Sequence, residues 1–228
     1  MIPKFSFIIP VWNEEAIISR TIEQVLSPQV SRFAEIIVVD GDPAGRTINV
    51  AHHLGVKTAI SEKGRGNQMN LGASLAAGEI LIFLHADTFL PPDALELIEM
   101  AMADGSCIAG AFDLAIDSER PAFRLIEKAA SFRSRMTRIP YGDQTVFVRK
   151  KDFLALGGFR DIPIMEDVDF MRRIKKRQGK ICIIGKAVRT SPRRWEREGI
   201  VYTTLRNWLI LSLYLFGVRP EKLIRFYR

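Results

Sequence analysis

Cysteine is scarce in this chain of 228 residues, which contains only Cys107 and Cys182. Small domains that depend on disulfides carry many more cysteines, so a disulfide-stapled scaffold is excluded. The two cysteines lie far apart in apolar segments, and we predict that both are reduced side chains of the core. No spacing of cysteine and histidine indicates a zinc site. These features favour a reducing compartment, and we expect a cytoplasmic protein, either free or at the inner face of the membrane.

Long apolar runs are also absent. The longest begins at Trp208 and ends at Val218, between Arg206 and Arg219. It is shorter than the roughly 20 residues that a membrane-spanning helix needs. The first residues lack the pattern of a signal peptide. Two interpretations of the tail stay open: a helix packed on the domain or on a second subunit, or a helix in the membrane interface with aromatic and basic side chains at the headgroups.

Acidic residues are outnumbered by basic ones. The chain has 33 Lys and Arg against 26 Asp and Glu, a formal net charge of +7, and much of the excess lies late in the chain. Such an excess fits a solvated face, an anionic membrane surface or an anionic ligand. Nucleic acid ranks below these, because no nucleic-acid-binding motif occurs. Apolar residues make up 47%, enough for the core of one α/β domain.

Short apolar runs rich in β-branched residues alternate with amphipathic segments. Continuous apolar strands separated by helices are typical of a mostly parallel sheet covered on both faces. We therefore predict an α/β fold with a helical C-terminal tail. The expected strands are residues 5–11, 35–39, 56–60, 80–84, 107–114 and 145–148. The expected helices are residues 14–26, 47–54, 67–77, a segment after Pro92, 118–136, 151–156 and 166–177.

The first two expected strands end in residues suited to contact a ligand. The first runs through Pro10 and Val11 towards Glu14, and the second ends at Asp40. In open α/β sheets, ligands bind beyond the carboxyl ends of strands. Each motif alone also fits a local role, since Asn13 and Glu14 suit the start of a helix. Asp40 with the glycine after it likewise suits an ordinary turn.

A basic, glycine-rich turn precedes the third expected helix. Gly64, Arg65 and Gly66 stand just before its first residue. The free N–H groups and the dipole of a helix start favour a phosphate, and Arg65 could add a bidentate contact. The segment is not a P-loop, because no Lys-Ser or Lys-Thr pair follows the glycines. The alternative is a basic surface turn.

Two acidic motifs follow later in the chain. His85 and Asp87 leave a buried strand two positions apart, which places both side chains on one side if the chain stays extended. Both can bind a divalent cation, although Mg²⁺ prefers oxygen; the alternative is that Asp87 caps a turn. Glu166 and Asp167 begin the last expected helix, where acidic residues are common for dipole reasons alone. The functional interpretation is a general base at the edge of the sheet.

Taken in order, these five motifs resemble those of the family 2 glycosyltransferases. The resemblance runs from about Lys4 to Arg177, and the variants at residues 84–88 and 141–144 look like a small bacterial branch. It implies the GT-A fold, a Rossmann-like α/β fold with a mostly parallel central sheet flanked by helices. In this reading residues 1–197 form the catalytic domain, with a nucleotide-binding half at 1–90 and an acceptor half at 91–197. Residues 198–228 form an amphipathic helical tail.

The resemblance also implies an activity and a site. Such enzymes transfer a sugar from a nucleoside-diphosphate sugar to an acceptor hydroxyl with inversion, usually with Mg²⁺ or Mn²⁺. Asp87 would hold the metal, with His85 as a second candidate ligand, and Asp167 would take the acceptor proton. The implied donor-binding residues are Pro10, Val11, Glu14, Asp40, Gly64, Arg65, Asn70, His85, Ala86 and Asp87. The implied acceptor-side or diphosphate residues are Asp143, Gln144, Glu166, Arg193, Arg194 and Trp195.

Two departures from the family pattern leave alternatives open. His85 stands where the family has an aspartate, which leaves one carboxylate for a metal, and Pro43 follows Asp42 where the family has serine after glycine. The alternatives are a sugar nucleotidyltransferase and a non-catalytic nucleotide-sugar-binding scaffold at a membrane. The sequence names no acceptor; a lipid-linked acceptor, peripheral membrane contact or a homodimer would each suit the apolar tail.

Overall fold

The structure, a computed structural model, describes residues 3–26, 33–103 and 105–226. The strands are β1 (Phe5–Val11), β2 (Ala34–Asp40), β3 (Lys57–Ile60), β4 (Ile80–Phe83), β5 (Thr88–Phe89), β6 (Cys107–Ile116), β7 (Val146–Arg149) and β8 (Lys180–Thr190). The helices are α1 (Ile18–Val25), α3 (Arg46–His52), α4 (Arg65–Leu75), α5 (Ala94–Met102), α6 (Pro121–Thr137), α7 (Lys150–Ala155), α8 (Glu166–Lys176), α9 (Arg193–Glu198), α10 (Ile200–Leu215) and α11 (Pro220–Leu223).

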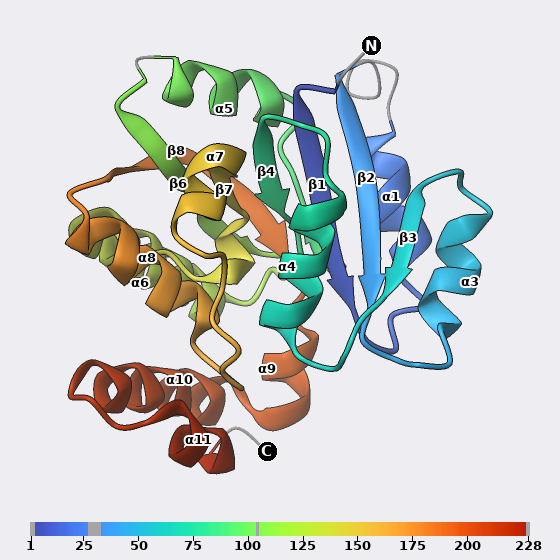
Figure 1. Cartoon of the computed structure of the whole chain (residues 1–228). Helices are drawn as coiled ribbons and strands as arrows, with labels where there is room; N and C mark the ends of the chain where they lie inside the picture. The colour runs from blue at the N-terminus through green and yellow to red at the C-terminus, as the bar shows by residue number, and fades with distance from the viewer. Residues whose placement is uncertain (1–2, 27–32, 104, 227–228) are drawn as a thin grey trace.

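The described strands form one sheet in the order β3-β2-β1-β4-β7-β6-β8-β5 (Figure 1). β1 lies between β2 and β4 and is parallel to both, and β3 continues this parallel half beyond β2. In the other half β6 and β8 are parallel, whereas β7 and β5 run antiparallel to their neighbours. The predicted α/β fold with a mostly parallel central sheet is therefore confirmed.

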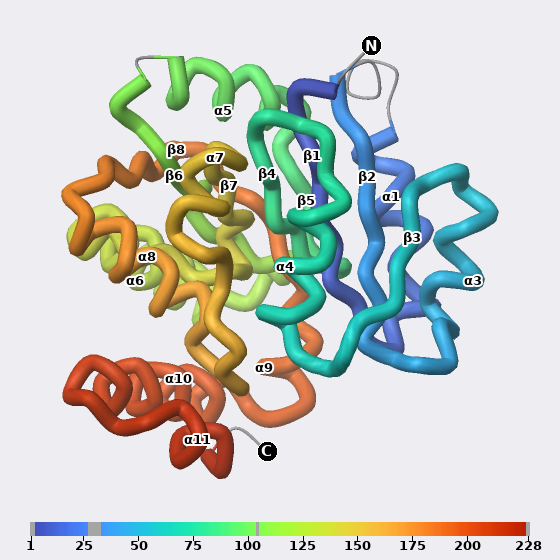
Figure 2. The backbone as a smooth tube through the Cα atoms, viewed as in Figure 1, coloured from blue at the N-terminus to red at the C-terminus, as the bar shows by residue number. Residues whose placement is uncertain are grey.

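Both faces of the sheet are covered by helices. Successive side chains of a strand point to opposite faces, so Phe7 and Ile9 of β1 pack in a cluster with α1, α3 and α5. Ile8 between them packs in a second cluster with α4, α7 and α8. All three side chains are fully buried. Figure 2 shows α4 and α7 in front of the sheet. Burial on two sides explains why β1 is a continuous apolar run rather than an alternating one.

The predicted elements up to α8 are found within a few residues except for the start of the first helix, and the short strand β5 was not predicted. The first helix begins at Ile18 rather than at residue 14, because residues 14–17 form a turn after Asn13, whose φ is 55°. β8 was not expected at all. Its eleven residues are interrupted by Gly185, and its pairing with β6 changes register twice, so the strand lacks the regular apolar pattern on which a sequence prediction depends.

The C-terminal helices dock on α8. Ile164 and Val168 pack with Ile210 and Tyr214 of α10 and with Leu223 of α11. Within the described ranges, no helix has both the length and the apolar character required to cross a membrane. The predicted division at residues 90 and 197 stays a prediction, and β5 and β8, on opposite sides of the first boundary, pair in the same sheet.

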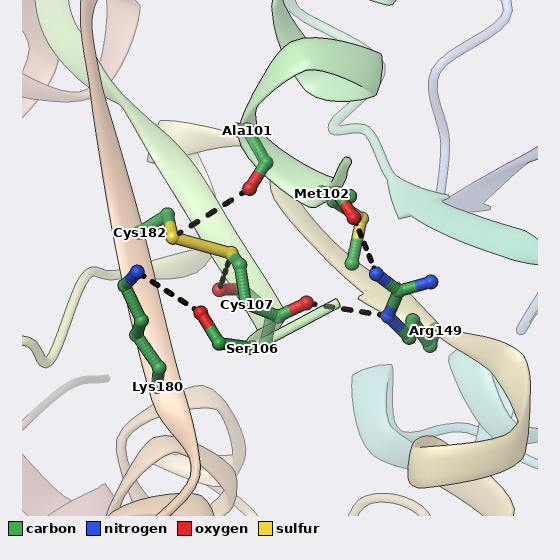
Figure 3. The surroundings of a disulfide bond; sticks show 8 residues. Ala101, Met102, Ser106, Cys107, Arg149, Lys180 and Cys182 are labelled. Carbon is green, nitrogen blue, oxygen red and sulfur yellow. Dashed lines mark hydrogen bonds between the residues drawn. A yellow bond between two sulfur atoms is a disulfide. The ribbon is translucent and has the colours of Figure 1, made fainter. Parts of the chain in front are cut away.

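The two cysteines lie side by side rather than apart. Cys107 of β6 and Cys182 of β8 form a disulfide with Cα atoms 6.1 Å apart (Figure 3). The prediction of two separate reduced cysteines is therefore wrong. It failed because parallel pairing of β6 and β8 brings together residues that are 75 positions apart in the chain. The cysteines consequently give no support to a reducing compartment.

Close packing of the sheet at Gly110 of β6 can be tested by substitution. A Cβ there would lie 2.3 Å from the Phe147 ring and 2.4 Å from the carbonyl oxygen of Cys182. Overpacking of this kind typically costs about 1–3 kcal/mol, so we expect Gly110→Ala to lower the free energy of unfolding by about that amount. The measurement is urea unfolding at equilibrium.

Gly185→Ala on the neighbouring strand β8 is the matched control. A Cβ there would meet only the end of the Arg135 side chain, at 3.3 Å, which can move aside. We expect the control to unfold at nearly the wild-type urea concentration. Equal effects of the two substitutions would contradict the close approach of β6, β7 and β8.

Candidate active site

A cavity of about 720 Å³ lies at the carboxyl ends of β1, β4 and β8. Its walls also include the starts of α4 and α8 and residues of α9 and α10. In Figure 1 the arrowheads of β1 and β4 point towards this side of the molecule, where α9 and α10 lie. The position agrees with the general rule that ligands of open α/β sheets bind beyond the carboxyl ends of the strands.

Twelve of the residues singled out in the sequence come together in this cavity. They come from segments between residue 10 and residue 195, and all of them contribute to its lining. The twelve are Pro10, Glu14, Arg65, His85, Ala86, Asp87, Asp143, Glu166, Asp167, Arg193, Arg194 and Trp195. The other five, Val11, Asp40, Gly64, Asn70 and Gln144, do not line the cavity but lie in the layer behind it.

Asp40 and Val11 hold the loops beneath the cavity. The buried carboxylate of Asp40 accepts hydrogen bonds from the backbone N–H groups of Asp42, at 2.9 Å, and Thr47, at 3.2 Å. The side-chain amide of Gln68 donates to the carbonyl oxygen of Val11 at 2.7 Å and to that of Val39 at 2.9 Å. These contacts fix where β1 and β2 end and where α4 lies against them.

Gly64, Asn70 and Gln144 set the course of the backbone, either through a positive φ or through side-chain hydrogen bonds to backbone groups. Gly64 precedes α4 with a φ of 146°, a value that L side chains rarely adopt. Asn70 exchanges two hydrogen bonds with the backbone of Phe159, at 2.8 and 2.9 Å. The amide of buried Gln144 donates to the carbonyl oxygen of Phe112 at 2.8 Å. Each residue positions a segment that borders the cavity.

Arg193 of α9, late in the chain, pairs with two carboxylates from the first half of the chain. Its guanidinium donates to both oxygens of Glu14, at 2.6 and 2.8 Å, and its Nε lies 3.2 Å from Oδ2 of Asp87. Bidentate pairs of this kind are among the stronger charge-assisted contacts. The short helix α9 is thereby tied to the residues that follow β1 and β4.

Asp167 and His85 are packed around Gly142. The backbone N–H of Gly142 donates to Oδ2 of Asp167 at 2.6 Å. A Cβ on Gly142 would lie 3.0 Å from Nε2 of His85 and 3.4 Å from Oδ2 of Asp167, so glycine leaves room for both groups. Burial, together with the positive charges of Arg65 and Arg193, lowers the pKa of His85 to about 3. The imidazole is therefore neutral at physiological pH.

Two further carboxyl groups in the cavity have raised pKa values, because their surroundings disfavour the charged form. Burial raises the pKa of Asp143, Arg133 opposes this shift and the charge of Asp167 adds to it, with a net pKa of about 6. Burial also raises the pKa of Glu166, while Arg65, whose Nη1 lies 3.7 Å from its Oε1, opposes the shift. Carboxyl groups with raised pKa values in a cavity are typical of sites for proton transfer or ion binding.

The sequence gave no role to several lining residues. Thr190 and Ser191 follow β8, and Asn207 and Ile210 lie on α10. These were missed because β8 was not expected and because the tail was considered only as a packing or membrane segment. Trp12, which follows the predicted strand-end residues Pro10 and Val11, also lines the cavity, and its ring centroid lies 4.0 Å from the Lys63 ammonium group, a cation–π contact.

A family comparison decides the class of protein. Residues 6–159 match the family described as glycosyl transferase family 2. The chain belongs to this family. The predicted resemblance to this family is thereby confirmed.

Curated relatives of this family 2 chain match only part of it. A dolichol-phosphate mannosyltransferase of Pyrococcus furiosus is 30% identical over 112 residues, which cover 46% of this chain and 32% of that protein. A PGL/p-HBAD biosynthesis glycosyltransferase of Mycobacterium bovis is 33% identical over 95 residues, covering 39% and 37%. The matched region thus spans about a third of each relative.

Solved structures share the fold over most of this chain. S. aureus TarS 1–349, in complex with UDP-GlcNAc, has a TM-score of 0.64 at 18% identity and covers 82% of this chain and 58% of that one. The mannosyltransferase PcManGT from Pyrobaculum calidifontis, in complex with GDP-Man and Mn²⁺, has a TM-score of 0.64 at 19% identity, covering 84% and 57%. At this level of identity the likeness shows the fold.

The raised pKa of Asp143 gives a test of the site's electrostatics. Between its usual pKa of 3.8 and the value of about 6 in the folded protein, the folded state binds more protons than the unfolded chain. Stability therefore falls as the pH rises through this range. Asparagine carries no charge. We therefore expect the free energy of unfolding of Asp143→Asn to exceed that of wild type by about 1–3 kcal/mol at neutral pH. The gain should vanish near pH 4.

The measurement is urea unfolding of both proteins at several pH values. Glu23→Gln on the exposed side of α1 is the control, because it removes one negative charge away from the cavity. We expect no comparable pH-dependent gain there. A gain for Asp143→Asn that is independent of pH would contradict the raised pKa.

Proposed function

We propose that the cavity binds a nucleoside-diphosphate sugar and transfers its glycosyl group to an acceptor hydroxyl with inversion. The observation that supports this most directly is the placement of Asp167, which lines the same cavity as Arg193 and Asp87 and is held by the Gly142 N–H. A candidate proton acceptor and a group of charges suited to a diphosphate thus share one space. Family membership supports the same reaction class.

The reaction is a single displacement at the anomeric carbon. The acceptor oxygen forms the new bond to that carbon, Asp167 takes the hydroxyl proton, and the bond to the diphosphate oxygen breaks with its electron pair leaving on the nucleoside diphosphate. A positioned base of this kind typically contributes about 10²- to 10⁴-fold to the rate. The Gly142 N–H fixes one carboxylate oxygen of Asp167, so the base is held in place before the acceptor arrives.

The cations of the cavity suit the leaving diphosphate. Arg65 at the start of α4, together with Arg193 and Arg194 of α9, lines the cavity, and fixed positive charges stabilise the charge that develops on the leaving group. The solved complexes of TarS with UDP-GlcNAc and of PcManGT with GDP-Man support a nucleotide-sugar donor. Arg193 pairs with Glu14 and Asp87, so a contact between Arg193 and the diphosphate would replace part of these ion pairs.

The side chains of this site suit Mg²⁺ or Mn²⁺, which would bind between the protein and the donor. Asp87 offers a carboxylate and His85 a neutral imidazole, both suitable ligands for a divalent ion. Among the described residues, no group of three His, Cys, Asp or Glu could hold a metal. The diphosphate would therefore complete the coordination. When bound, the ion would supply positive charge at the leaving group. The ion pair between Arg193 and Asp87 would then have to break, so that the Asp87 carboxylate could bind the ion.

The acceptor side is formed by α8, α9 and α10. Asn207 and Ile210 bring the C-terminal helices into the cavity wall. The dolichol-phosphate mannosyltransferase among the relatives and the apolar character of α10 support a lipid-linked acceptor, presented to a peripherally bound enzyme. Contact with a second copy through the same helices is the alternative. A sugar nucleotidyltransferase has no support from the family match.

A thermal-shift screen tests donor binding. We expect one class among UDP-, GDP-, dTDP- and CDP-sugars to raise the unfolding temperature, and Mn²⁺ to increase the shift, because ligands that bind only the folded state stabilise it. A shift without a metal effect would show that Asp87 and His85 do not bind a metal with the donor. Binding without transfer to any acceptor would favour the non-catalytic scaffold.

Substitution of Asp167 tests the proposed base. We expect Asp167→Asn to lower kcat by about 10²- to 10⁴-fold while the donor still raises the unfolding temperature as in wild type. The amide keeps the shape of the side chain but cannot take the proton. Turnover is measured as release of nucleoside diphosphate in the presence of acceptor.

Asp117→Asn is the matched control, since Asp117 is exposed and lies outside the cavity. It should leave both turnover and the donor shift unchanged. Near-normal turnover of Asp167→Asn would remove Asp167 from the mechanism, whereas loss of the donor shift would indicate a role in binding instead.

A further inference from the structure

One face of α10 is exposed and almost entirely apolar. Phe216, directly after the helix, is 88% exposed, and Trp208 in its middle is 52% exposed. The only charged residue within the helix is Arg206, which is buried and pairs with Glu198 at 2.5 Å. We call the exposed apolar residues the apolar face of α10; Ser212 is exposed among them, and the face consists of Val201, Tyr202, Leu205, Trp208, Leu209, Leu215 and Phe216.

The apolar face lies opposite the docked side of the same helix. Thr203, Arg206, Ile210 and Tyr214 are the buried residues of α10, and their spacing of three or four marks one side of a helix. Ile210 and Tyr214 pack against Ile164 and Val168. Because this side already anchors the helix, the apolar face is not required for the fold, and its hydration costs free energy that a partner would recover.

Exposed basic side chains follow the apolar face in the chain. Arg219, Lys222 and Arg225 are exposed in the segment after α10, where the only exposed acidic residue among the described ones is Glu221. Anionic headgroups complement these cations, and an apolar helix face with basic flanks is typical of helices that lie in a membrane interface.

We propose that the apolar face of α10 binds the surface of an anionic lipid bilayer. The helix lies in the interface rather than across the bilayer, since its 16 residues extend roughly 24 Å and no described helix can span. The trailing basic residues contact the headgroups. Asn207 and Ile210 line the cavity from the docked side of the same helix, so this mode of binding places the cavity about one helix diameter from the lipid surface. The proposal does not depend on glycosyl transfer.

Vesicle flotation of the purified chain tests the proposal. We expect the protein to float with vesicles that contain phosphatidylcholine and phosphatidylglycerol, and to bind pure phosphatidylcholine several-fold more weakly. The double substitution Leu205→Glu with Leu209→Glu should lower the partition coefficient at least about tenfold, because it puts two charges into the apolar layer. Lys222→Glu with Arg225→Glu should weaken binding to the anionic vesicles alone and reduce its salt dependence.

Met100→Glu is the matched control. Met100 is 74% exposed on α5, which lies at the opposite end of the molecule from α10 (Figure 1). It should float like wild type. Circular dichroism and the donor-induced thermal shift confirm that each variant is folded and separate a failure of membrane binding from a failure of the proposed function.

Trp208 gives a second readout that needs no destabilising substitution. Lipids with brominated acyl chains should quench its fluorescence, and Trp208→Phe should remove most of the quenching although Trp12 and Trp195 remain. Wild-type protein that neither floats nor is quenched would overturn the proposal. A second outcome would also overturn it: wild type is a dimer in size-exclusion chromatography and does not bind vesicles, and the Leu205→Glu, Leu209→Glu variant is a monomer. The apolar face would then bind a second copy of the chain.

Discussion

Parallel pairing of β1 with β2 and β4 is the constraint on which the site depends. Because the three strands run in the same direction, the residues that follow them emerge at one edge of the sheet. Glu14 after β1 and Asp87 after β4 thereby lie within reach of a single side chain. The full burial of β1 on both faces fixes this register, since a slip by one residue would exchange the side chains between the two helical layers.

Arg193 connects this edge to the last part of the chain. Its contacts with Glu14 and Asp87 tie α9 to the sheet, and α9 leads directly into α10. Phe123 of α6 adds a ring contact with Trp195 at 6.0 Å. The edge of the sheet that lines the cavity is therefore connected to the C-terminal helices through the short helix α9, which ion pairs hold in place. A donor that competes for Arg193 would act on the same link.

The C-terminal helix α10 serves two environments at once. Its buried side packs against α8 and contributes to the cavity wall, while its other side meets the solvent with apolar residues. The apolar composition of the tail made it look ambiguous in the sequence, because the same run suits a core, a dimer or a membrane interface. Docking through Ile210 and Tyr214 accounts for only one side of the helix. The exposed basic residues that follow it in the chain then favour a lipid surface for the other.

The sequence by itself determined the α/β architecture, the family and the five motifs, because strand burial, helix periodicity and strand-end residues are local signals. Tertiary structure decided which motif residues meet. Asp40 and Asn70 bond to backbone rather than line the cavity, and Arg193 reaches Glu14 across 179 positions. It also joined Cys107 to Cys182 through β8. Such contacts depend on which strands become neighbours, and no periodicity within one segment records that choice.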